Sequence, residues 1–229
     1  MLTVHRKTPG EGKNMRRLHT MVLLVSLMGS MSGVQSETIT VDHERAEKWN
    51  KFVQDLYSFH KERIQKQEVS TEERIGGYGG VTNDLEFYRE VRYYAKDSGR
   101  LLADIKWENR KPDNLHSIEL YLYDDKGRIS RDYTAAYLPP YRNAPIQTLI
   151  SIHRYKDGLH SSRQFDVSDN RIFEFCVGQY RGEKVHIVFD DYEIPTMAGE
   201  IKDKSIREAY RECFSDMPRT VKLYLKPGE

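Results

Sequence analysis

Histidines are the side chains of this chain best suited to metal binding or acid–base chemistry. Outside the first 36 residues they are His43, His60, His116, His153, His160 and His186. Neutral imidazole binds zinc and exchanges protons near neutral pH. No H-x-H, H-x3-H or H-E-x-x-H spacing joins these residues, so the sequence predicts no metal site and no cofactor.

The same histidines would suit a hydrolase if one of them activated a nucleophile. His153 and His160 flank a turn, and His186 lies on a predicted strand near Asp190. No G-x-S-x-G motif accompanies them. We therefore assign no catalytic residue and keep a hydrolase that uses His153, His160 or His186 as an alternative to a binding function.

Tyrosines form a second candidate site. The chain has 15 tyrosines, and several fall on strand positions opposite the aliphatic ones: Tyr88, Tyr94, Tyr121, Tyr123 and Tyr155. Such side chains offer a large amphipathic contact area at a low cost in conformational entropy, so the pattern favours a surface that binds a protein or a small apolar ligand. Cross-strand tyrosine pairs that only stabilise an exposed sheet are the alternative.

The two cysteines, Cys176 and Cys213, predict one disulfide if the protein is exported. Free buried thiols or a redox pair are the alternatives, but neither cysteine belongs to a C-x-x-C motif. In a strand over residues 171–179, Cys176 would point away from Phe173 and Phe175. If the phenylalanines face the main core, the disulfide would place Cys213 on the other face of the sheet or at its rim.

Export itself is predicted from residues 1–36, which resemble a signal peptide with Met15 as an alternative start. Its apolar part, residues 21–29, is too short to span a bilayer, which takes about 20 residues. An uncleaved anchor is the alternative. Cleavage removes five basic residues and one acidic residue, so the formal net charge changes from +1 to −3. Without a basic block, the remaining chain is not expected to bind nucleic acid, and we predict a periplasmic or secreted location.

A helix over residues 41–67, capped by Thr40 or Asp42, follows the leader. Its apolar residues recur at three and four residue intervals, and Trp49 and Phe52 belong to that stripe. This stripe needs a broad apolar surface to cover it, which a sheet would provide. We predict a ligand pocket beneath Trp49 and Phe52.

Strands dominate the rest of the chain, and the clearest hairpin spans residues 118–137, where period-two alternation flanks an Asp/Gly turn. We expect about eight strands with local connections: 85–95, 101–108, 118–123, 129–137, 146–155, 161–167, 171–179 and 184–192. Residues 68–84, which include Gly76, Gly77, Gly79 and Gly80, read as a polar hinge rather than a phosphate-binding loop.

Towards the end of the chain we expect a helix over residues 203–214, with Asp203 as its N-cap, and a last edge strand containing Val221, Leu223 and Leu225.

The fold class predicted from the sequence is therefore α+β. Residues 37–229 would form a single exported domain, in which a long N-terminal helix packs on a curved antiparallel meander with a short C-terminal helix. The leading functional hypothesis is a non-enzymatic binding or accessory protein, with a structural envelope component as a further alternative.

Overall fold

The structure is a computed structural model that describes residues 2–3, 43–78, 84–139, 142–191, 193–195 and 198–228. All of these residues belong to one compact unit. The predicted leader, apart from residues 2–3, lies outside them, as do the predicted helix caps Thr40 and Asp42.

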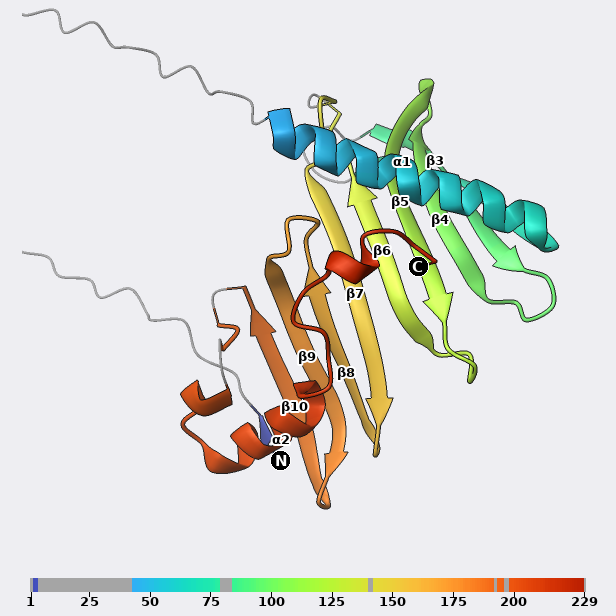
Figure 1. Ribbon diagram of the computed structural model, residues 1–229. Helices are drawn as coiled ribbons and strands as arrows, with labels where there is room; N and C mark the ends of the chain where they lie inside the picture. The colour runs from blue at the N-terminus through green and yellow to red at the C-terminus, as the bar shows by residue number, and fades with distance from the viewer. Residues whose placement is uncertain are drawn as a thin grey trace, which may run out of the picture. The chain divides into compact units, whose positions relative to one another are not determined.

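Nine antiparallel strands form one sheet in which every strand pairs with its neighbour in sequence (Figure 1). They are β2 (Val69–Tyr78), β3 (Asp84–Ala95), β4 (Leu101–Glu108), β5 (Lys111–Tyr123), β6 (Ile129–Ala136), β7 (Gln147–Lys156), β8 (Leu159–Phe165), β9 (Arg171–Tyr180) and β10 (Glu183–Asp190). A two-residue strand, β1 (Leu2–Thr3), adds to β10 in the parallel sense. The predicted antiparallel meander is confirmed.

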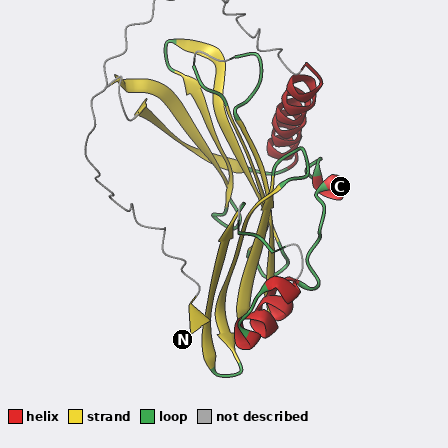
Figure 2. Cartoon of the chain, turned by 90° about the vertical axis from the view of Figure 1, so that its left-hand side faces the viewer, coloured by secondary structure: helices red, strands yellow, loops and turns green. Residues whose placement is uncertain are grey.

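Two α-helices lie on the same face of this sheet (Figure 2). The first, α1 (His43–Lys66), has 24 residues, and the second, α2 (Lys204–Phe214), has 11. Because α1 begins at residue 43, it is the first helix of the described chain rather than the N-terminal segment of the whole chain. Short 3-10 turns, η1 (Ala198–Glu200) and η2 (Lys222–Tyr224), complete the fold, and the α+β class is confirmed.

The core lies between the helices and the face of the sheet that they cover. On α1, the side chains of Trp49, Phe52 and Leu56 are buried, and the Phe52 ring centroid lies 6.3 Å from that of Tyr133 on β6. Strand alternation supplies the opposing surface, which includes Leu120 and other fully buried aliphatic residues. The apolar stripe predicted for the helix therefore packs on the sheet, as expected.

One predicted connection is a strand instead. Residues 69–78 form β2, with Gly76 and Gly77 inside it, so the polar hinge predicted for 68–84 is wrong over this part. The predicted last edge strand is also wrong. Val221 is buried and begins a 3-10 turn, while Leu223 is 77% exposed. The Asp169 carboxylate accepts a hydrogen bond from the Val221 backbone amide at 2.6 Å, and Val221 packs in the core instead of pairing as a strand.

The disulfide between Cys176 and Cys213 is confirmed, with a Cα–Cα distance of 6.2 Å. The predicted position of Cys213, on the other face of the sheet or at its rim, is wrong, because α2 lies on the same face as α1 (Figure 2). Cys176 and Glu174 are buried on the helix-covered face, whereas Phe173 and Phe175 are only partly buried on the opposite face. The assumption that the phenylalanines face the core was the error, because Arg163 pairs with Glu174 and allows that carboxylate to be buried in their place.

The opposite face of the sheet, which we call the open face, carries many charged side chains. Glu90 on β3 is fully buried there, with Arg74 of β2, Arg92 of β3 itself and Lys106 of β4 around its carboxylate. Cations on three strands thus compensate one buried carboxylate. Within the described residues, no helix is long and apolar enough to cross a membrane.

Candidate functional site

A cleft of about 730 Å³ opens between α1 and strands β3–β5. It lies on the helix-covered face, beside the core rather than inside it. Its lining residues are Asn50, Val53, Gln54, Tyr57, Arg89, Tyr93, Trp107, Pro112, Asp113, Leu115 and Tyr137.

Local periodicity explains why these side chains converge. On α1, Asn50, Val53, Gln54 and Tyr57 follow the three and four residue spacing of one helical stripe. On the sheet, Arg89 of β3 pairs directly with Trp107 of β4, so both side chains project from the same face towards α1. The helix and the sheet therefore each contribute one wall of the cleft.

Polar groups at the cleft are held in place by their neighbours. The Tyr137 hydroxyl donates a hydrogen bond to Asn50 Oδ1 at 2.9 Å, and Asn50 Nδ2 donates to the Asn143 carbonyl at 2.6 Å. Burial raises the pKa of Tyr137, and burial followed by the nearby Tyr57 raises the pKa of Tyr93. Both phenols are therefore neutral hydrogen-bonding groups at neutral pH.

Charge in the cleft is balanced. The Arg89 guanidinium lies 5.1 Å from the centroid of the Trp107 ring and donates to Glu73 at 3.3 Å. Asp113 supplies a carboxylate in the same lining. The lining thus contains one charged side chain of each sign, and the cation is already paired with Glu73.

Trp49 and Phe52, which were predicted to border a pocket, belong to the core instead. They are 5% and 3% exposed, and neither lines the cleft. Trp49 Nε1 donates to Ser168 Oγ at 3.2 Å. The helix residues that do line the cleft lie on the adjoining stripe.

The sequence analysis did not predict the aromatic residues of the cleft as site residues. They are Tyr57, Tyr93, Trp107 and Tyr137. Trp107 could have been found, because strand alternation places it on the helix-facing side.

Of the predicted site tyrosines, Tyr88, Tyr94, Tyr121 and Tyr155 lie on the open face. Two of them hydrogen bond to carboxylates within the sheet. The Tyr94 hydroxyl donates to Glu72 at 2.9 Å, and the Tyr121 hydroxyl donates to Glu119 at 2.7 Å.

The other two stack on histidines. Tyr88 stacks on His116 with a centroid distance of 6.0 Å, and Tyr155 stacks on His160 at 4.3 Å. Each of the four tyrosines is therefore engaged with a neighbour inside the sheet.

Tyr123 is separated from these four by an irregularity in β5. The register shifts between Leu122 and Tyr123, so that Tyr123 pairs with Ile129, on the side of the sheet that α1 covers. Its hydroxyl donates to the Leu101 carbonyl at 2.7 Å, and Arg63 of α1 lies close enough to lower its pKa, although burial raises it more. The five tyrosines consequently do not form one surface.

Two of the candidate histidines join in a hydrogen-bonded chain on the open face. His153 Nε2 lies 2.6 Å from Asp132 Oδ2, and His153 Nδ1 lies 3.1 Å from His160 Nε2. Burial lowers the pKa of His160, and His153 lowers it further. Among the described residues, no hydrogen bond connects either ring to a serine, and no group of three or more His, Cys, Asp or Glu side chains is arranged to hold a metal ion.

Comparison with known proteins gives little further information. No family model matches the chain, and no curated protein matches it. Two solved structures that align with part of it are DUF3836 family proteins, from Bacteroides vulgatus and Parabacteroides distasonis. Each is 8% identical, and they cover 54% and 55% of this chain and 100% and 93% of their own, with TM-scores of 0.21 and 0.19. The functional argument therefore rests on the cleft.

Proposed function

We infer that this chain is an exported binding protein that holds a small, uncharged ligand in the cleft between α1 and β3–β5. The observation that carries this inference is a space of about 730 Å³ with aromatic side chains on both of its walls. Ligand pockets typically measure about 300 to 1,000 Å³ and combine apolar walls with a few fixed polar groups.

The lining also indicates the kind of ligand. The aromatic side chains offer flat apolar surfaces, and the amides of Asn50 and Gln54 offer hydrogen bonds near them. Arg89 and Asp113 can each bind a polar substituent, but together they give a charged ligand no net attraction. A ring with hydroxyl or amide groups along its edge, such as a neutral sugar, fits this combination of groups.

Export is supported by the chemistry of the cysteines. Disulfides persist in oxidising compartments and are rare in the reducing cytosol. The Cys176–Cys213 bond is therefore consistent with a protein that acts outside the cytoplasm, in the periplasm or secreted, as residues 1–36 also suggest.

The open face is the weaker candidate for a binding surface. Its tyrosines already make hydrogen bonds or ring contacts within the sheet, so a partner would have to replace these contacts. A role as a structural envelope component would need no occupied cleft at all.

Tryptophan fluorescence tests the cleft directly, because the chain has two tryptophans and only Trp107 lines it. In a Trp49→Phe variant, Trp107 is the sole reporter. We expect titration with neutral disaccharides, beginning with cellobiose, to change its emission. Native mass spectrometry of the chain recovered from its source cells should show the same class of compound as an adduct.

Matched variants separate the cleft from the open face. Tyr57→Ala should weaken binding of the disaccharide by about tenfold, which corresponds to the loss of one aromatic contact. Tyr155→Ala on the open face should leave the affinity unchanged. If neither an adduct nor an emission change is observed, or if Tyr57→Ala binds as tightly as the parent, the cleft is not the ligand site.

A further inference from the structure

The two edges of the sheet differ in how well they could accept another strand. An edge strand presents a row of unpaired backbone N–H and C=O groups, which proteins usually protect with charges, bulges or covering segments. β2 is protected in this way. Glu72, Glu73 and Arg74 lie exposed along it, and its register with β3 shifts between Gly76 and Tyr78.

β10 lies at the other edge, next to the two residues of β1, and the part of the chain that the structure describes places no bulge or charged side chain along its centre. Val185, Ile187 and Phe189 are buried on the helix-covered face, and Val188 is partly buried on the open face. The charged residues Lys184 and Asp190 lie near its two ends. A strand that is regular, apolar in the middle and charged at both ends is well suited to pairing with another strand.

The structure shows that this edge does accept a strand. Leu2 and Thr3 pair with Val185 and His186 in the parallel sense (Figure 1). These two residues belong to the segment predicted to be removed during export. After that removal, the outer side of β10 would have no partner from β1.

We propose that the exported chain pairs β10 with β10 of a second copy in the antiparallel sense, which makes the protein a two-fold symmetric dimer. This proposal depends on removal of the leader but not on the ligand cleft, which lies at the other end of the sheet. A two-fold axis perpendicular to the sheet keeps the helices of both copies on one face and continues the sheet through the interface.

Charge and length select the register. With the axis at Ile187, Lys184 of each copy lies opposite Asp190 of the other, Val185 lies opposite Phe189, and His186 lies opposite Val188. These pairs follow from the residue order of β10, because directly opposed residues must share a face. The opposite charges at both ends of the strand pair attract each other.

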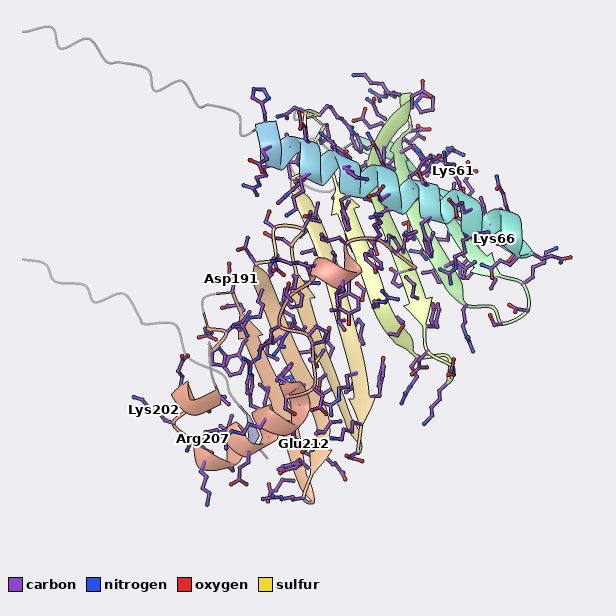
Figure 3. The ribbon with its side chains drawn as sticks, viewed as in Figure 1. Lys61, Lys66, Asp191, Lys202, Arg207 and Glu212 are labelled. Carbon is purple, nitrogen blue, oxygen red and sulfur yellow. A yellow bond between two sulfur atoms is a disulfide. The ribbon has the colours of Figure 1, made fainter. Side chains whose placement is uncertain are left out.

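The neighbouring registers are less favourable. An axis at His186 places Lys184 opposite Val188, and an axis at Val188 shortens the overlap and places Asp190 opposite His186. With the axis at Ile187, pairing ends at Lys184 and Asp190, because the next residues outward, Glu183 and Asp191, are both acidic. Asp191 is labelled in Figure 3, where the chain leaves β10.

A charge exchange tests the proposal on protein recovered from the exported fraction of cells that express the full chain. Sedimentation velocity over a range of concentrations measures the dimer, and intact mass identifies the N-terminus. We expect a chain that lacks residues 2–3 and dimerises as its concentration rises. Lys184→Asp or Asp190→Lys alone should raise the dissociation constant by about tenfold or more, because each creates two like-charge pairs per dimer.

The double variant K184D/D190K restores both attractions and should recover the parent dissociation constant, an outcome that a general loss of folding would not give. Glu72→Lys on the β2 edge is the matched control and should have no effect. A monomer at every concentration, a dimer indifferent to the single exchanges, or an exported chain that retains residues 2–3 would each overturn the proposal.

Discussion

The two helices pack on the same face of one sheet, but they are held there by different interactions. At the α2 end, covalent and ionic contacts add to the apolar packing of Ala209 and Phe214. Cys213 is bonded to Cys176, and the buried Glu174 carboxylate accepts hydrogen bonds from Arg163 at 2.5 Å and from Tyr210 at 2.8 Å. Arg163 also donates to the carbonyl of Pro218 at 2.7 Å, which holds the chain that follows α2.

At the α1 end, apolar contact is the main interaction, and no disulfide joins the described residues of α1 to the sheet. Phe52 and Leu56 pack on the sheet, and a few hydrogen bonds add to them, such as that from Arg63 to the Tyr121 carbonyl at 2.7 Å. Along the edge of this contact, α1 and the sheet diverge enough to leave the cleft. The difference indicates that the two ends have different roles: the α2 end stabilises the fold, and the α1 end leaves room for a ligand.

The largest effect on stability is expected when the Glu174 carboxylate at the α2 end is removed. Glu174→Ala leaves the buried Arg163 guanidinium without its counter-charge, which typically costs about 3 to 5 kcal/mol. We expect the free energy of unfolding in urea to fall by that amount. Glu62→Ala, which removes an exposed carboxylate on α1, is the matched control and should change stability by no more than about 0.5 kcal/mol. A Glu174→Ala chain as stable as this control would show that the ionic network is not needed.

Removing the disulfide tests the same end of the sheet by another route. The bond closes a loop of 37 residues, and the chain-entropy model gives about 3 to 4 kcal/mol for such a loop. The double variant C176A/C213A should therefore unfold at a lower urea concentration, and reductant should no longer affect its transition.

When Trp49→Phe is combined with this variant, Trp107 is the sole reporter, and its emission should equal that of Trp49→Phe alone, because Trp107 lies at the α1 end. A changed Trp107 spectrum would show that the two ends are coupled and would contradict their separate roles.

Much of this arrangement could be predicted from the sequence, because its signals are local. Alternation about an Asp/Gly turn predicts the hairpin of β5 and β6, and Asp203 predicts the start of α2, where its carboxylate accepts a hydrogen bond from the Ile206 amide at 3.0 Å. β2 escapes prediction because it is an edge strand with exposed side chains on both faces, so no alternation marks it.

The cleft could be predicted only in part, since it depends on how two elements pack. Periodicity identifies the apolar stripe of α1, but it does not decide which residues sit at the centre of the contact, such as Phe52, and which sit at its margin, such as Tyr57. The sequence also did not predict which side chains of β9 face the helices. Two phenylalanines outweigh Glu174 in a pattern of hydropathy, and partners from distant parts of the chain, Arg163 on β8 and Tyr210 on α2, reverse that preference.

The smallest of the three predicted losses of stability, after those from Glu174→Ala and from removal of the disulfide, occurs at the α1 end. There, acid should weaken the contact between the helix and the sheet. His60 is buried against Tyr93, with ring centroids 4.5 Å apart, and burial together with the nearby Arg63 lowers its pKa from 6.5 to about 4. Above pH 6.5 the imidazole is neutral in both folded and unfolded chains, so it does not change stability. Between pH 6.5 and 4 only the unfolded chain gains the proton, which lowers the free energy of unfolding by up to about 3 kcal/mol.

Urea titrations of the parent and of His60→Gln at several pH values isolate this contribution, since the carboxylates titrate alike in both chains. The parent should lose more stability than the variant as the pH falls from 6.5 to 4, and hydrogen exchange should show the added loss of protection in α1 before α2. Equal losses in the two chains would mean that His60 does not control the acid sensitivity of α1. In that case the contrast between the two helix contacts would lie in their bonding and not in their response to pH.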